Sequence, residues 1–152
     1  MNTVIENTLD EATEYGGFWR RFAALFIDFI TMVLPILLIS TVFRIVIFLV
    51  IDADLNMLNM ADSVLTIVLW WLYFACLHAS PWQASLGKRV LGLKVVDLNG
   101  NRISFSRATG RFFAEYLSAL TLCIGYMMAG WTKRKQSLHD MVAKTYVIKS
   151  KA

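Results

Sequence analysis

The residue with the clearest chemical potential is Asp28, because it interrupts an apolar run from Ala23 to Phe43 that is long enough to cross a bilayer. A carboxylate in the middle of a membrane helix costs about 2.5 to 3.5 kcal/mol, so a compensating partner or a function is expected. Arg21 lies two helical turns earlier on the same helix face and is a candidate partner. A carboxylate at this depth binds either a proton or a monovalent cation, but not both at once. That competition is the minimal requirement for cation/proton exchange.

Three further polar side chains are candidates for the same chemistry. Asp140 follows a basic stretch near the carboxyl end, where it would compete with Asp28 for Arg21. Its alternative role is structural, because an aspartate at the start of a helical turn accepts hydrogen bonds from free backbone N–H groups. His78 lies near the end of a second apolar run and His139 stands beside Asp140. Both histidines are candidate proton relays, with a hydrogen-bonded boundary residue as the alternative.

The composition indicates an all-α integral membrane protein. The chain is 57% hydrophobic and 17% charged, whereas about 25% of the residues of a soluble domain are charged. We predict one domain over residues 1–152, with membrane helices over 19–43 and 63–80. Trp19 and its aromatic neighbours flank the start of the first helix, as expected at a lipid–water boundary.

The distribution of charge predicts the topology. Residues 1–18 form an acidic tail, and the loop 44–62 holds three aspartates against one arginine. The region 81–111 carries six bases and one acid, and the tail 133–152 is again basic. The positive-inside rule then places the loop outside and both basic regions in the cytoplasm. We therefore expect a multi-pass protein of the cell membrane, specifically a bacterial inner membrane, with both termini cytoplasmic.

A third apolar segment, residues 112–132, has two interpretations. A single crossing would put the basic tail outside, against the charge rule. A short helical hairpin that enters and returns keeps the tail inside. Glu115 shortens the apolar length, and Gly125 with Ala129 gives the spacing of small residues that favours close helix packing.

The region between the second and third apolar segments predicts a small cytoplasmic β structure. Asn99-Gly100 is a strong hairpin signal and would join residues 91–97 to 102–105. Residues 145–148 form another β-branched strand candidate. Pairing of 91–97 with 145–148 would require both segments to lie in one compartment.

Several functions are not indicated by the sequence. Gly87-Lys88 resembles the end of a phosphate-binding loop, but the preceding glycine and the following Ser or Thr are missing. No nucleophile elbow or zinc-protease motif occurs, so we expect no enzyme activity, no metal, no cofactor and no nucleic-acid partner. Lys88 and Arg89 are instead expected to contact anionic lipid headgroups.

Three sequence motifs, taken together, resemble the RDD family of membrane proteins. They are FWRRFAALFID at 18–28, SLGKRVLGLKVVD at 85–97 and SLHD at 137–140, and they occur in the order expected for that family. The family is named for one arginine and two aspartates, and the resemblance places these on Arg21, Asp28 and Asp140.

The resemblance implies transport, with cation/proton antiport proposed for some family members. Asp28, Arg21 and Asp140 would then be the ion- and proton-coupling residues. The alternative is a membrane assembly or accessory subunit in which the same cluster only holds the helices together. Two spans and a hairpin leave little room for a pathway, so a transporter of this size is expected to be a homo-oligomer.

Overall fold

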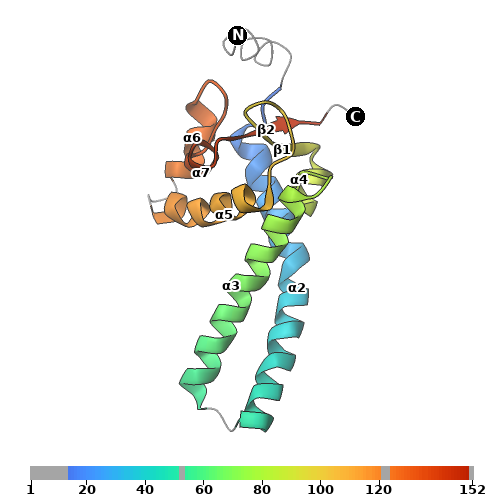
Figure 1. The fold of residues 1–152 in the computed structure, drawn as a ribbon, viewed down its shortest axis with the longest axis vertical. Coiled ribbons are helices and arrows are strands. Elements are labelled where there is room, and N and C mark those ends of the chain that lie inside the picture. Colours follow the sequence, from blue (N-terminus) through green and yellow to red (C-terminus); the bar gives the residue numbers. More distant parts are fainter. Residues whose placement is uncertain (1–13, 52–53, 121–123, 151–152) are drawn as a thin grey trace.

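The computed structural model describes residues 14–51, 54–120 and 124–150 and is mostly helical. It has two parts (Figure 1). The stalk consists of residues 30–51 and 55–69, which belong to the two long helices α2 (Phe18–Ile51) and α3 (Leu55–Ala79). The head contains the other described residues and surrounds the start of α2 and the end of α3.

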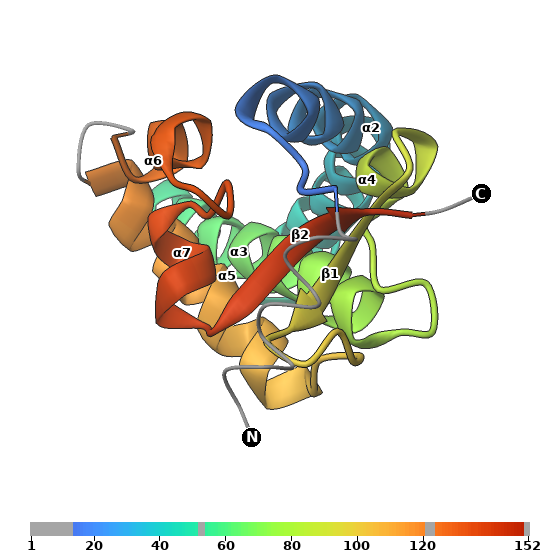
Figure 2. The same ribbon diagram turned by 90° about the horizontal axis from the view of Figure 1, so that it is seen from above.

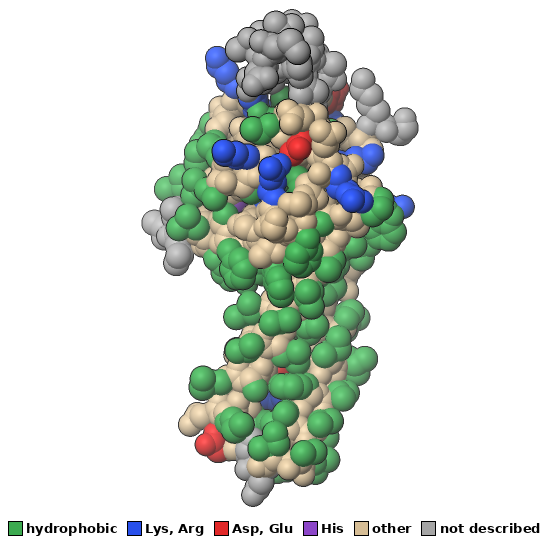
Figure 3. All heavy atoms as spheres, in the orientation of Figure 1, with side chains coloured by type: hydrophobic (Ala, Val, Ile, Leu, Met, Phe, Trp, Pro, Cys, Tyr) green, Lys and Arg blue, Asp and Glu red, His purple; other side chains and the backbone are tan. Residues whose placement is uncertain are grey.

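The stalk helices expose apolar side chains along most of their length (Figure 3). Both α2 and α3 are long and apolar enough to cross a membrane by length and composition. They are longer than predicted, and residues 44–62 are not a loop over most of their length. Asp54 begins α3 as its N-cap, because its side chain accepts a hydrogen bond of 2.7 Å from the backbone N–H of Met57. Arg44 and Asp62, which were assigned to the loop, therefore lie on α2 and α3, and Asp52 lies outside the described residues.

A two-stranded antiparallel sheet lies in the head and confirms the pairing of the two distant segments. Strand β1 (Leu93–Asp97) pairs with β2 (Thr145–Lys149), with Val95 opposite Val147. The predicted strand at 102–105 is wrong. The Asn99-Gly100 turn does form, with Gly100 at φ +80°, but after it Ile103 turns into the core and a helix begins.

The third apolar segment is divided between two helices, α5 (Phe105–Leu120) and α6 (Ile124–Trp131), which contact each other. Two contacting helices agree with the hairpin interpretation, and residues 121–123 between them lie outside the described residues. Gly125 lets the helices approach closely, because a Cβ there would lie 2.9 Å from the Cα and Cβ of Ser118. Helix α5 packs against α3 and extends to one side of the two long helices (Figures 1 and 2).

The predicted terminal tails take part in the head. The carboxyl region contains α7 (Leu138–Val142) and β2, so residues 133–152 are not a simple tail. At the other end Tyr15 forms a β-bridge with Ile148, while residues 1–13 of the predicted acidic tail lie outside the described residues. A short helix, α4 (Leu86–Val90), packs against α2. The apolar core joins α2, α3, α5 and the sheet through Ala24, Ala75, Leu93, Val95, Ile103, Ala108 and Val147.

Candidate functional site

The structure brings Arg21 and Asp140 into direct contact. One guanidinium nitrogen of Arg21 donates a hydrogen bond to the fully buried carboxylate of Asp140. The same guanidinium donates to the carbonyl oxygens of Gly16 at 2.7 Å and Lys135 at 2.6 Å. Arg20 is exposed on the adjacent helix face. Arg21 therefore connects the start of α2 to the segment that leads into α7.

A second arginine, Arg111 on α5, holds the other side of Asp140. Its Nη2 and Nε donate to Asp140 Oδ1 at 2.6 and 3.1 Å. Ser137 donates through its hydroxyl at 2.8 Å and its backbone N–H at 3.2 Å, which completes a capping box at the start of α7. Burial alone would raise the pKa of the Asp140 carboxyl, but the charges of Arg21 and Arg111 outweigh burial and hold this pKa well below its ordinary value.

Asp28 lies in a separate cluster of neutral donors. Its carboxylate accepts hydrogen bonds from the Tyr73 hydroxyl at 2.6 Å, the Ser85 hydroxyl at 2.6 Å and the Gly87 backbone N–H at 2.7 Å. Asp28 is fully buried in the first third of α2, where α2 packs against α4. No hydrogen bond or ion pair between Asp28 and Arg21 is found in the described structure. Asp28 therefore attaches α3 and the start of α4 to α2.

Gly87 explains why α4 approaches so closely. A Cβ at this position would clash with the backbone carbonyl of Ala24 and would lie 3.0 Å from the Cγ of Asp28. Only a glycine allows the backbone N–H at position 87 to reach the carboxylate at this distance.

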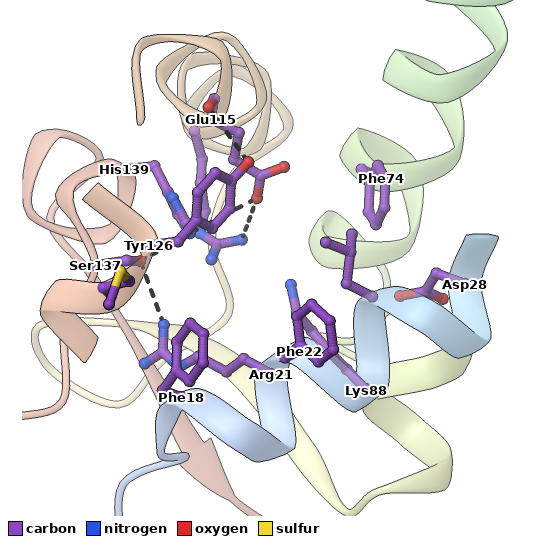
Figure 4. Close-up of a pocket in the computed structure, with 13 residues that line it drawn as sticks. Phe18, Arg21, Phe22, Asp28, Phe74, Lys88, Glu115, Tyr126, Ser137 and His139 are labelled. Carbon is purple, nitrogen blue, oxygen red and sulfur yellow. Dashed lines mark hydrogen bonds and ion pairs between the residues drawn. The ribbon is translucent and has the colours of Figure 1, made fainter. Parts of the chain in front are cut away.

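A cavity of about 370 Å³ lies between the two clusters (Figure 4). Lys88 reaches into it, and its buried ammonium nitrogen lies 2.9 Å from Nε2 of His78. Across the cavity, Glu115 lies 3.5 Å from Nη1 of Arg111. Burial lowers the pKa of Lys88 to about 7, with a further contribution from the charge of Arg111. Burial raises the pKa of Glu115, although Arg111 opposes that shift.

The two histidines occupy different positions. His78 faces Lys88, whereas His139 lies 2.8 Å from the hydroxyl of Ser137 through its Nε2. Because that hydroxyl donates to Asp140, it accepts from His139. Burial lowers the pKa of His139 well below its ordinary value, so this side chain is neutral in the folded protein.

The sequence analysis identified Arg21, Asp28 and Asp140 but missed the groups that complete each cluster. Arg111 served only as one base in a charge count, although it lies three residues after Ala108 and next to Phe112, on a side of the helix that carries apolar residues. Tyr73 carried no signal and Ser85 was noted only as the start of the second motif, because their contact with Asp28 depends on long-range packing. In the described part of the chain, no three His, Cys, Asp or Glu side chains are grouped so that they could hold a metal ion.

Comparisons with known proteins identify the family. The RDD family model matches residues 15–144. The protein YxaI of Bacillus subtilis (strain 168), described as uncharacterized, is 34% identical over 146 residues, which cover 88% of this chain and 96% of YxaI. The uncharacterized membrane protein YteJ of the same organism is 32% identical over 145 residues, covering 90% of this chain and 82% of YteJ. No solved structure matches the chain. The chain therefore belongs to the RDD family and is a membrane protein.

Proposed function

We propose that the protein crosses the bacterial cell membrane twice, through α2 and α3, with its head and both termini in the cytoplasm. Residues 30–51 rise about 33 Å, close to the ~30 Å thickness of the hydrocarbon core. The bridge between Tyr15 and Ile148 brings both ends of the described chain into the head. Arg44 is the only Lys or Arg of the stalk, so the described positive charge gathers in the head (Figure 3).

Within this topology, the function that the site supports best is proton-coupled exchange of a monovalent cation, centred on the head cavity. The observation that carries this proposal is the pair of Lys88 and Glu115, whose pKa values burial moves toward neutrality from opposite sides. With a pKa of about 7, Lys88 takes up and releases protons near physiological pH, whereas an exposed lysine does not.

Glu115 is the carboxylate best placed to exchange a proton for a cation. Asp28 and Asp140 are already occupied by several hydrogen-bond donors. In the described structure the Glu115 carboxylate has only longer contacts, at 3.5 Å to Arg111 and 3.8 Å to His139. Protonated Lys88 would repel a cation at Glu115 and neutral Lys88 would not, so protonation and cation binding compete.

A transport pathway requires more than one copy of the chain, because two helices cannot enclose one. The stalk supports a homo-oligomer, since it contains a partly exposed ion pair between Arg44 and Asp62 at 3.4 Å. Charged side chains at membrane depth are costly when they face lipid. A second copy that covers this pair would remove that cost.

The second candidate function is a non-transport assembly or accessory subunit, in which the polar residues only hold the head together. The observation in its favour is the dense bonding of Asp28 and Asp140, which is typical of structural groups. The two candidate functions predict different results for substitution of Glu115. Exchange requires its carboxylate, whereas a purely structural role does not, because Glu115 does not connect the helices as the aspartates do.

The test measures cation-driven proton movement in everted membrane vesicles that contain the native chain or Glu115→Gln. Exchange by the native chain that Glu115→Gln abolishes, with normal membrane insertion, supports the proposal. Glu14→Gln is the matched control, because Glu14 is exposed and pairs with Lys149 at the surface. Equal exchange by Glu115→Gln and the native chain would reject Glu115 as the coupling group, and no exchange by the native chain would reject transport.

A further inference from the structure

The cavity in the head has two chemically different walls. One wall is polar and carries the cations Lys88 and Arg111. The other is apolar and is formed by Phe18, Phe22, Leu25, Phe74 and Met127. In Figure 4 the Lys88 side chain passes beside Phe22, and its nitrogen points toward the side of the cavity where Glu115 lies. A site with these two walls fits a ligand that is itself amphipathic.

The polar wall contains a donor that makes no hydrogen bond within the described structure. Nη1 of Arg111 lies 3.5 Å from Glu115 in a long ion pair. It has no hydrogen-bond partner among the described residues, although the side chain is buried and the cavity is open to it. A charged donor without a hydrogen bond in a buried site is more costly than a neutral one. Lys88 is also buried, and its three N–H groups exceed the single acceptor found for it in the described part of the chain, His78. Both groups are therefore available to an anion.

The two carboxylates that line the cavity leave room for such an anion. Asp28 points its oxygens toward Tyr73, Ser85 and Gly87. Glu115 lies beside Arg111, and burial raises the pKa of the Glu115 carboxyl. Once protonated, Glu115 adds a donor and no negative charge to the polar wall.

The apolar wall continues to the outer surface of the molecule. Phe22 is 54% exposed, Leu25 is 44% exposed and Met127 is 42% exposed, and all three line the cavity. Phe22 and Leu25 are on α2, just before the stalk begins. In the proposed topology, this rim lies where the cytoplasmic leaflet of the bilayer meets the head, so a lipid chain can lie against it.

We propose that the cavity binds the anionic headgroup of a membrane amphiphile, with its phosphate or carboxylate on Arg111 Nη1 and Lys88 Nζ and its acyl chain against Phe22, Leu25 and Met127. This inference goes beyond the exchange proposed above, because headgroup binding does not require transport. The volume of about 370 Å³ is roughly that of a dozen liquid water molecules at ~30 Å³ each, so a lone phosphate ion would leave most of it unfilled.

The experiment measures binding to the purified full-length protein in a neutral detergent, by native mass spectrometry and by the shift in melting temperature. The probes are phosphatidylglycerol, phosphatidylcholine and inorganic phosphate. We expect phosphatidylglycerol to bind at least tenfold more tightly than the other two. Equal binding of both lipids would overturn the role of charge, and equal binding of inorganic phosphate would overturn the role of the acyl chain.

Two variants locate the site, each with a matched control. Lys88→Gln removes one cation, and Lys144→Gln is its control, because Lys144 is exposed and does not line the cavity. Leu25→Trp fills the apolar rim, and Leu34→Trp is its control on the exposed face of the stalk. We expect at least a tenfold loss of phosphatidylglycerol binding for each cavity variant and no change for either control.

The inference fails if Leu25→Trp binds phosphatidylglycerol as well as Leu34→Trp does. This comparison decides the outcome even if Lys88→Gln does not fold, because Leu25 makes no polar contact within the described structure. Circular dichroism and gel filtration establish that each variant is folded. Binding is measured without an ion gradient, so absence of transport leaves this result unaffected.

Discussion

Two buried aspartates in the head are compensated in opposite ways. Asp140 is held by two positive charges, those of Arg21 and Arg111. Asp28 is held by neutral donors, two hydroxyls and one backbone N–H. Both carboxylates are fully buried, so burial alone does not distinguish them.

The difference shows what each aspartate can tolerate. Losing the Asp140 carboxylate leaves two arginines facing each other in a buried site, and such uncompensated charge is expensive. Losing the charge of Asp28 leaves only neutral groups, which can rearrange their hydrogen bonds. Substitution of Asp140 should therefore destabilise the protein more than substitution of Asp28. Substitutions in the cavity between the two clusters should destabilise it least.

The largest effect is expected for Asp140→Asn. Because Arg111 would remain buried without its counter-charge, we expect a loss of about 3 to 5 kcal/mol in stability. Thermal unfolding followed by circular dichroism in detergent measures it, with Glu14→Gln as a surface control that should change little. A loss no larger than that of Asp28→Asn would remove the distinction between the clusters.

Acid should reproduce a smaller version of the same loss. The folded-state pKa of Asp140 is depressed, so its stabilisation is complete above the unfolded pKa, near the ordinary 3.8, and disappears as pH falls toward the folded value. The folded-state pKa lies well below 3.8, so part of the stabilisation remains at pH 3 and the loss should be smaller than in Asp140→Asn. Melting temperatures between pH 7 and pH 3 should decline more steeply for the native chain than for Asp140→Asn. If the melting temperatures of the two proteins fell in parallel with pH, Asp140 would not be the source of the acid sensitivity.

Gly87→Ala should break the Asp28 cluster by crowding. The added Cβ clashes with the Ala24 carbonyl and displaces the N–H that Asp28 accepts, for a loss of about 1 to 3 kcal/mol. Gly110→Ala is the matched control, since a Cβ there meets nothing within 4 Å. In the helical position 110 alanine should stabilise by up to about 1 kcal/mol. Chemical denaturation measures the free energy of unfolding of both variants. Equal changes in this free energy would contradict the close packing of α4 against α2.

The smallest effect is expected for Tyr73→Phe. It removes one neutral donor from Asp28 and leaves two, so the loss should be about 0.5 to 1.5 kcal/mol. Tyr116→Phe, at a half-exposed position of α5, is the control. If Tyr73→Phe lowered the free energy of unfolding as much as Asp140→Asn does, the neutral donors would stabilise the head as much as the arginines do.

The sequence predicted the features that depend on local composition or on a motif. The two apolar helices, the pairing of residues 93–97 with 145–149 and the family are confirmed. Arg21 and Asp140 also meet, as the sequence suggested. These predictions succeeded because hydrophobic runs and β-branched strands each leave a signal within a single segment.

The sequence did not predict how the head is packed. Asp28 was expected to interact with Arg21, but its partners come from α3 and from the start of α4, which only tertiary structure brings together. The helix ends at 51 and 55 were missed because Asp52, Asp54 and Asp62 suggested a loop, whereas the Asp54 cap favours a helix. The expected third strand was lost because Ile103 packs into the core.

The central claim is that the head contains one titrating carboxyl, Glu115, between two structural ones. Infrared spectroscopy of the protein in lipid, recorded as a function of pH, measures the protonated carboxyl band directly. Because burial raises the pKa of Glu115, we predict a band that persists above the ordinary value of 4.5 and is absent in Glu115→Gln. A band that survives in Glu115→Gln and disappears in Asp28→Asn would contradict the claim and return the coupling role to Asp28.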